Sequence, residues 1–135
     1  MPLVDTHSIP LSLIVSGTNT HDSKLLDDVL GARIVSPAEG TEQDVCLDAA
    51  FVGKEEVVEA HGYTPHIRPR GEEAQEIKRN PDFKARRWIV ELFHSWMNRF
   101  RKLIPRYEKT DLSYCALLKL ACGMIVWNRI EIIYG

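Results

Sequence analysis

The first half of the chain alternates short apolar runs with short polar stretches, which is typical of strands separated by brief helices. Three branched apolar runs predict strands, at residues 10–16, 45–51 and 63–67. Two helices are expected between them, at residues 22–30 and 53–61. Thr20 or Asp22 is expected to cap the first helix, and Gly31 and Gly62 suit the two helix ends.

The second half is expected to be helical. Residues 68–82 are rich in charge, proline and glycine and predict an exposed loop. A long helix is expected from residue 83 to Ile104, where Pro105 ends it, and a last helix from Leu112 to Ile133. On the first of these helices the apolar spacing predicts a core-facing stripe of Ile89, Phe93, Trp96, Phe100 and Leu103. The opposite, polar face holds Arg87, Glu91, His94 and Asn98.

This order of elements predicts one mixed α/β domain over residues 1–135. In such folds polar sites lie at the carboxyl ends of strands. Asp48 lies near the end of its predicted strand, followed by the small residues Ala49 and Ala50. Asp48 is therefore a candidate site residue.

The charge is divided unevenly along the chain, although the formal net charge is only -2. Residues 1–65 carry 3 positive and 11 negative side chains, whereas residues 66–110 carry 12 positive and 6 negative. The middle segment could therefore face a polyanion, and a charged, solvated helix is the alternative.

Cysteine usage and hydropathy narrow the class of protein further. Cys46, Cys115 and Cys122 have no metal-ligand spacing and predict reduced core thiols in a cytosolic protein. No signal peptide is evident, and the apolar run from Leu112 to Trp127 is too short and too charged for a membrane span.

Two carboxylates could carry metal chemistry. Asp48 on a strand and Glu91 on a helix, 43 residues apart, could both bind Mg²⁺ if the helix packs against the sheet. A helical ion pair with Arg87 is the alternative for Glu91, and a turn or helix cap is the alternative for Asp48.

Several motifs resemble one family, the acid-triad (DDE) transposases of bacterial and archaeal insertion sequences. The second acid of that family lies in a motif that reads LDAAF here, with Asp48, and the glutamate lies in a motif that reads RWIVE, with Glu91. Further matching segments are NTHDSKLL at 19–26, GYTPHIRPRGEE at 62–73, WMNRFRKL at 96–103, RYEK at 106–109 and WNRI at 127–130. The resemblance implies a ribonuclease H-like mixed sheet with flanking helices, Mg²⁺- or Mn²⁺-dependent strand cleavage and joining at terminal inverted repeats, and a prokaryotic, nucleoid-associated location.

The chain also departs from the family pattern. The first acid of the triad has no counterpart, since Asp5 aligns with the second strand of the family sheet and not the first. Leu92 and Phe93 stand where the family usually has a basic residue and a small hydroxyl residue. The resemblance predicts no separate DNA-reading domain within residues 1–135. The resemblance therefore predicts the C-terminal part of a catalytic domain, a truncated or split copy that is inactive alone.

Two functions remain open from the sequence. The first is an enzyme fragment in which Asp48 and Glu91 are metal ligands and an upstream transposase fragment supplies the missing Asp. The second is a catalytically inactive remnant that binds DNA at transposon ends or target sites, or associates with itself or with other transposase copies. The expected DNA-binding residues are Arg87, Asn98, Arg99, Arg101, Lys102 and Arg106.

Overall fold

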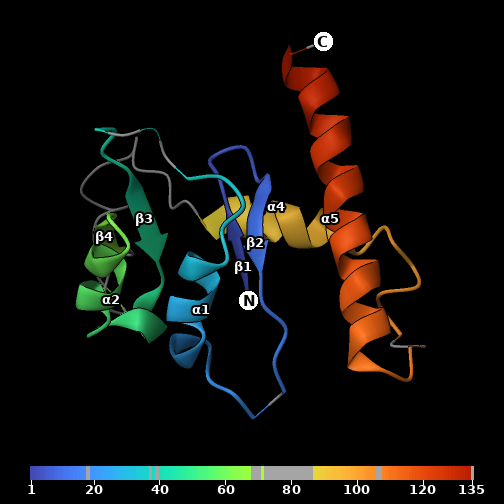
Figure 1. The fold of residues 1–135 in the computed structure, drawn as a ribbon, viewed down its shortest axis with the longest axis horizontal. Coiled ribbons are helices and arrows are strands. Elements are labelled where there is room, and N and C mark those ends of the chain that lie inside the picture. Colours follow the sequence, from blue (N-terminus) through green and yellow to red (C-terminus); the bar gives the residue numbers. More distant parts are fainter. Residues whose placement is uncertain are drawn as a thin grey trace.

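The computed structural model describes residues 1–17, 19–36, 38, 40–67, 71, 87–105 and 108–134. Its strands are β1 (Pro2–Val4), β2 (Pro10–Leu13), β3 (Asp44–Leu47) and β4 (Thr64–Ile67). Its α-helices are α1 (Leu26–Gly31), α2 (Glu55–Ala60), α4 (Arg87–Met97) and α5 (Asp111–Tyr134), and short 3-10 turns span Asp22–Lys24 and Ala49–Phe51. Figure 1 shows α4 crossing behind the β1–β2 hairpin and α5 running along one side of the molecule. The fold is mixed α/β, as the sequence predicts.

The strands form two small sheets. β1 and β2 are an antiparallel pair with an irregularity between Leu3 and Val4. β3 and β4 are a parallel pair in which Val45 lies opposite Pro65. Pro65 has no backbone N–H to donate to a neighbouring strand. The short β4 strand tolerates this loss because it makes few backbone hydrogen bonds. Among the described residues these two pairs are not joined into one sheet, so the continuous ribonuclease H-like sheet that the resemblance implies is not seen.

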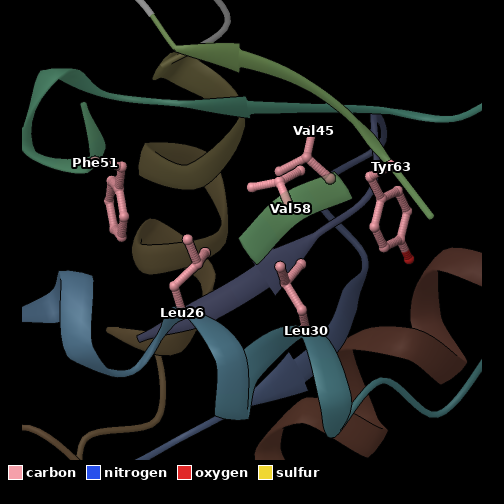
Figure 2. Close-up of a cluster of buried hydrophobic side chains, with 6 residues drawn as sticks. All are labelled: Leu26, Leu30, Val45, Phe51, Val58 and Tyr63. Carbon is pink, nitrogen blue, oxygen red and sulfur yellow. The ribbon is translucent and has the colours of Figure 1, made fainter. Parts of the chain in front are cut away.

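One hydrophobic cluster lies between the β3–β4 pair and α1 (Figure 2). Its buried members come from α1, β3, α2 and the segments beside them: Leu26, Leu30, Val45, Phe51, Val58 and Tyr63. Met1 and Leu3, at the start of the chain, pack against the same cluster. The Ser12 hydroxyl of β2 donates a buried hydrogen bond of 2.7 Å to the Val29 carbonyl of α1. The hairpin and the parallel pair therefore share one core although their backbones are separate.

A second cluster joins the C-terminal helices to the hairpin. Leu103, Leu118 and Ala121 are its buried members, and Leu13 of β2 packs against them. The guanidinium of Arg129 lies 4.0 Å from the centre of the Trp96 ring, a cation–π contact between α5 and α4. Ile89, Phe93 and Leu103 are buried as predicted, whereas Trp96 and Phe100 are only half-buried.

Several element boundaries differ from the prediction. α4 ends at Met97 because the backbone then turns through i→i−3 hydrogen bonds, from Arg99 N–H to the Trp96 carbonyl and from Phe100 N–H to the Met97 carbonyl. The predicted helix start at residue 83 and the loop at 68–82 lie outside the described residues, apart from Gly71.

The first predicted helix is shorter than expected and has no side-chain cap. Residues Asp22–Lys24 form a 3-10 turn, and α1 begins only at Leu26. Neither Thr20 nor Asp22 caps it, because the turn intervenes between them and the helix. Leu26, Val29 and Leu30 are nevertheless fully buried on one face, as the periodicity predicts.

The cysteines are only partly as expected. Cys46 is exposed, because alternate residues of β3 face away from the core, whereas Cys115 and Cys122 are half-buried on α5. Burial raises the pKa of the Cys122 thiol, so the protonated form is favoured there. No disulfide joins these three cysteines.

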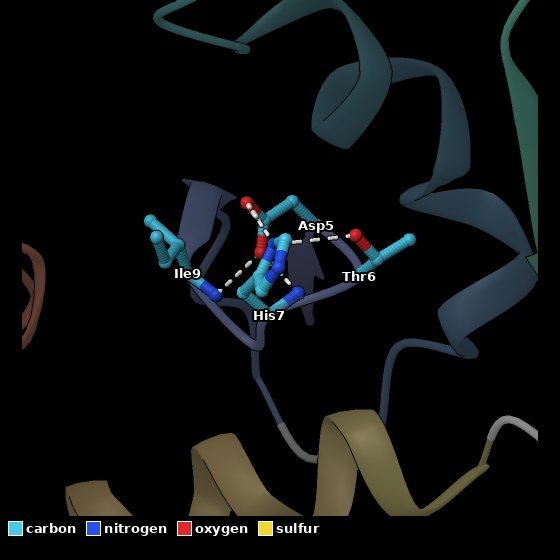
Figure 3. Close-up of polar contacts among 4 residues, drawn as sticks. All are labelled: Asp5, Thr6, His7 and Ile9. Carbon is cyan, nitrogen blue, oxygen red and sulfur yellow. Dashed lines mark hydrogen bonds and ion pairs between the residues drawn. The ribbon is translucent and has the colours of Figure 1, made fainter. Parts of the chain in front are cut away.

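The turn of the β1–β2 hairpin is held by one side chain (Figure 3). The Asp5 carboxylate accepts hydrogen bonds of 2.8 Å from the backbone N–H groups of His7 and Ile9. Between them lies Ser8, which is fully buried and has a φ of 63°. Its hydroxyl is the buried side-chain oxygen for which the described residues supply no hydrogen-bond partner. Ser8 therefore combines an unfavourable backbone φ with a buried hydroxyl that lacks a hydrogen-bond partner among the described residues.

Replacing Ser8 with Gly is expected to stabilise the domain by about 1–2 kcal/mol. Glycine adopts positive φ without strain, and removing the hydroxyl eliminates an unsatisfied buried group. Chemical denaturation measures the change. Ser8→Ala, which removes the hydroxyl but keeps the strained φ, is the matched control and is expected to gain less. A Ser8→Gly variant less stable than the original chain would contradict this account of the turn.

Candidate functional site

Asp48 lies where β3 ends. It is extended, with φ -80° and ψ 176°, and it is the N-cap of the turn Ala49–Phe51. Its Oδ1 accepts a hydrogen bond of 2.9 Å from the Ala50 N–H, and the residue is exposed. The capping alternative is therefore confirmed. The cap uses one carboxylate oxygen, and the exposed position keeps the side chain accessible from solvent.

Glu91 lies near the middle of α4, on its polar face. Ile89 and Phe93 are buried on the opposite face, which packs toward β1. Glu91, His94 and Asn98 are exposed, as the helical spacing predicts. The side chain of Arg87 lies outside the described residues, so the Arg87–Glu91 ion pair stays a prediction.

The two candidate acids do not form a closed metal site by themselves. Among the described residues, no three His, Cys, Asp or Glu side chains gather as they would to hold a metal ion. Asp48 follows a strand of the parallel pair, whereas Glu91 projects from the exposed face of a helix that packs on the hairpin. The described residues therefore do not make up a complete metal site, which needs further ligands.

Asp5 and Asp22 are the nearby acids that could substitute for a third ligand. The Asp5 carboxylate is committed to the hairpin turn through two backbone hydrogen bonds. Asp22 is exposed and begins the turn before α1. Neither forms a cluster with Asp48 and Glu91 within the described parts of the chain.

Asp22 instead contributes to a cleft that the sequence does not predict. The cleft, of about 430 Å³, lies between the hairpin, α4 and α5, and Asp22 and His94 are among its lining residues. The Met1 ammonium group donates a 2.7 Å hydrogen bond to the Ile14 carbonyl there. Burial lowers the pKa of this ammonium group, and the Asp22 carboxylate partly opposes the change. No motif marks the cleft, because its walls come from segments far apart in the sequence.

The predicted DNA-binding residues lie mostly on the connection between α4 and α5. Asn98, Arg99, Arg101 and Lys102 are exposed on the turns that follow α4, not on a continuing helix. The side chain of Arg87, and all of Arg106, lie outside the described residues. Three exposed cations therefore lie within the four positions from Arg99 to Lys102.

Two histidine–carboxylate contacts link elements that are far apart in the sequence. The His61 Nε2 lies 2.8 Å from Asp27 Oδ1, which links α2 to α1. The His66 Nε2 lies 3.0 Å from Asp44 Oδ1, across the β3–β4 pair. Each contact joins two elements, and partners 34 and 22 residues apart cannot be found by local spacing.

No helix within the described ranges is long and apolar enough to cross a membrane. This includes α5, whose length would suffice but which carries Lys119, Arg129 and Glu131.

Comparison with known proteins identifies the family. Residues 45–127 match the family model described as the transposase DDE domain. A Burkholderia cepacia protein, named as a presumed transposase for insertion sequence element IS402, is 28% identical over 133 residues. The match covers 96% of this chain and 62% of the relative, so the chain spans less than two thirds of the relative's length. No solved structure matches.

The matched range includes both candidate acids, Asp48 and Glu91. Transposases of this family act on DNA and generally use a divalent metal ion. The family model covers well over half of the chain. The chain thus belongs to the DDE transposases of insertion sequences.

Proposed function

We propose that this chain is the C-terminal part of a transposase catalytic domain, acting in DNA strand cleavage and transfer at the terminal inverted repeats of an insertion sequence. The observation that carries the proposal is the family match over residues 45–127, which contains Asp48 and Glu91 in their family motifs. Both acids are exposed, so DNA and solvated metal ions can reach them. The site of action is the nucleoid.

Asp48 and Glu91 would hold Mg²⁺ or Mn²⁺ together with a third carboxylate from another segment. When bound, such ions supply charge stabilisation at the attacking and leaving oxygens of the scissile phosphate. Hard carboxylate oxygens are the ligands these ions prefer. The absence of a three-ligand cluster among the described residues is consistent with a site that assembles only with that segment.

The split sheet supports the need for a further segment. β1 and β3 each pair on one side only among the described residues. Leu3 of β1 and Val45 of β3 nevertheless pack on the same hydrophobic cluster. Isolated two-stranded pairs are only marginally stable. A strand that paired with both edges would join the two pairs into one sheet and could bring its acid close to the end of β3.

A catalytically inactive, DNA-binding remnant is the second candidate function. The exposed cations that follow α4 favour it, because they need no metal site to bind phosphates. The proposed contacts are Arg87, Asn98, Arg99, Arg101, Lys102 and Arg106. Strand cleavage of a terminal-repeat duplex, assayed with the chain alone and with an upstream segment present, distinguishes the two functions.

DNA binding is expected to be nonspecific and steeply salt-dependent. Each cation that neutralises a phosphate contributes about 0.9 to the slope of log K against log salt on duplex DNA. Replacing Arg99, Arg101 and Lys102 with Ala should therefore reduce the magnitude of the slope by about 2–3. Fluorescence anisotropy on a labelled duplex, measured over a range of salt concentrations, gives the slope.

The matched control removes the same number of positive charges elsewhere, at Lys24, Lys54 and Lys119. It should leave the slope nearly unchanged, because these side chains lie outside residues 66–110, which carry the excess of positive charge. An equal loss of slope in both variants would show that net charge alone, and not the α4–α5 connection, binds the DNA.

A further inference from the structure

The cleft between the hairpin, α4 and α5 is lined by aromatic and apolar side chains and by the carboxylate of Asp22. Phe93 and Leu118, which are buried, and the half-buried Tyr114 are among its lining residues. Asp22 is exposed and comes from the 3-10 turn before α1. At about 430 Å³ the cleft falls in the size range of small-ligand sites. A ligand with a flat apolar body and hydrogen-bond donors would suit it.

The cleft adjoins both segments that carry the candidate acids. His94 lines it and follows Glu91 by three residues on α4, so the two side chains are neighbours on the helix surface. The turn that begins at Asp22 packs beside the turn Ala49–Phe51, which Asp48 caps. The cleft therefore lies beside the proposed place of strand cleavage.

The basic connection between α4 and α5 begins at the same cleft. Met97 is a lining residue, and the exposed cations Arg99, Arg101 and Lys102 follow it directly. Such cations attract DNA phosphates, whereas the negative charge of Asp22 repels them. A DNA strand held by its phosphates at the connection therefore presents a base, and not a phosphate, to the cleft.

We propose that the cleft binds one unpaired guanine of the DNA substrate, with Asp22 recognising the base. The Watson–Crick edge of guanine presents its N1–H and N2–H donors side by side, and the two oxygens of a carboxylate can accept both. Adenine and cytosine place an acceptor beside the amino group, and thymine places acceptors on both sides of its donor, so each opposes a lone pair to the carboxylate. The ring of Tyr114 provides the stacking surface.

The base must be unpaired because a duplex is far larger than the cleft. Enzymes that act on DNA extrude single nucleotides into pockets and recognise their Watson–Crick edges there. The inference rests on the proposed function in one respect, since it takes DNA to be the substrate. It needs no bound metal ion and no cleavage.

Binding of the full chain to four labelled duplexes tests the proposal, in EDTA so that no strand is cut. The duplexes differ only in one unpaired nucleotide opposite an abasic site, which is guanine, adenine, cytosine or thymine. We expect the guanine duplex to bind at least about five-fold more tightly than each of the others. Fluorescence anisotropy gives the dissociation constants.

Asp22→Asn should reduce the guanine preference to less than about two-fold, because an amide offers one acceptor and one donor group in place of two acceptors. The turn at Asp22 has no side-chain cap, so the thermal stability of the variant should match that of the original chain. Asp28→Asn is the matched control. It removes the same charge from an exposed residue of α1 that is not among the lining residues, and it should keep the preference.

Tyr114 is tested by two further variants. Tyr114→Leu should weaken binding of the duplexes with an unpaired base by about five-fold or more, because the stacking ring is lost. Tyr114→Phe keeps the ring and should keep the affinity.

Three results would overturn the proposal: equal affinity for the four duplexes, a guanine preference that survives Asp22→Asn, or no binding of any duplex. Failure of the proposed function gives a different pattern. In that case the guanine preference and its loss in Asp22→Asn are observed, but the chain combined with an upstream segment does not cut DNA.

Discussion

The 135-residue chain alone is expected to leave a terminal-repeat duplex uncut in Mg²⁺ or Mn²⁺. Adding an upstream segment that carries a further Asp is expected to raise cleavage by at least about a thousand-fold, the usual scale for an essential catalytic group. The physical reason is the ligand count. Two-metal phosphoryl transfer needs several carboxylates around the scissile phosphate, and the described residues bring no three such groups together.

The measurement is the amount of labelled duplex that the chain cuts with and without the upstream segment. The products are resolved on a denaturing gel. The control is the same segment with its Asp replaced by Asn, which should bind but not restore cleavage. Activity in the short chain that disappears on Asp5→Asn would contradict the account. That result would make Asp5 the first acid, despite its hydrogen bonds within the hairpin turn.

Replacing Phe93 with Ala is expected to have the largest effect on stability, a loss of about 3–5 kcal/mol in the free energy of unfolding. Phe93 is only 1% exposed, and α4 packs on β1 through the side of the helix that bears it. Truncation removes this contact and leaves a cavity between the helix and the hairpin. Such a loss approaches the total stability of many small domains.

Urea denaturation followed by tryptophan fluorescence measures the change. Trp88→Ala is a matched control on the same helix, because Trp88 is 52% exposed, and Trp96 and Trp127 still report unfolding in that variant. The control is expected to cost less than about 1 kcal/mol, as is usual for exposed positions. A Phe93→Ala variant that loses no more than the control would show that α4 does not contribute to the core.

Local pattern predicts much of the fold. The apolar periodicity of α1 places Leu26, Val29 and Leu30 on one face, and all three are fully buried. The run of apolar residues from Leu112 onward predicts α5 nearly to the residue. These successes share a cause, since burial of one face is a property of adjacent turns and needs no knowledge of distant partners.

Boundaries are less predictable because tertiary contacts and capping decide them. Pro105 suggests a helix to residue 104, yet the backbone leaves α4 after Met97 through i→i−3 hydrogen bonds. The apolar run at 45–51 suggests one strand, yet Asp48 ends β3 by capping the turn that follows. In both places a local hydrogen bond competes with continuation of the element.

Sheet assembly and the site lie further beyond local pattern. Nothing in the sequence of Leu3 or Val45 shows that their strands share a core without pairing. The polar face of α4 is correctly predicted, but the direction it faces depends on which side packs against the hairpin. The family motifs, and not spacing, single out Asp48 and Glu91, because each acid also fits an ordinary structural role.

The role of these two acids is tested most directly by Asp48→Asn and Glu91→Gln, in the chain combined with the upstream segment that carries the further Asp. Cleavage rate and duplex affinity are measured together, with Asp44→Asn and Glu59→Gln as controls on other exposed carboxylates. The account predicts that each site variant loses at least about a thousand-fold in cleavage rate, while its affinity for the duplex and both controls remain near the original values. Cleavage at the original rate by either site variant would contradict it.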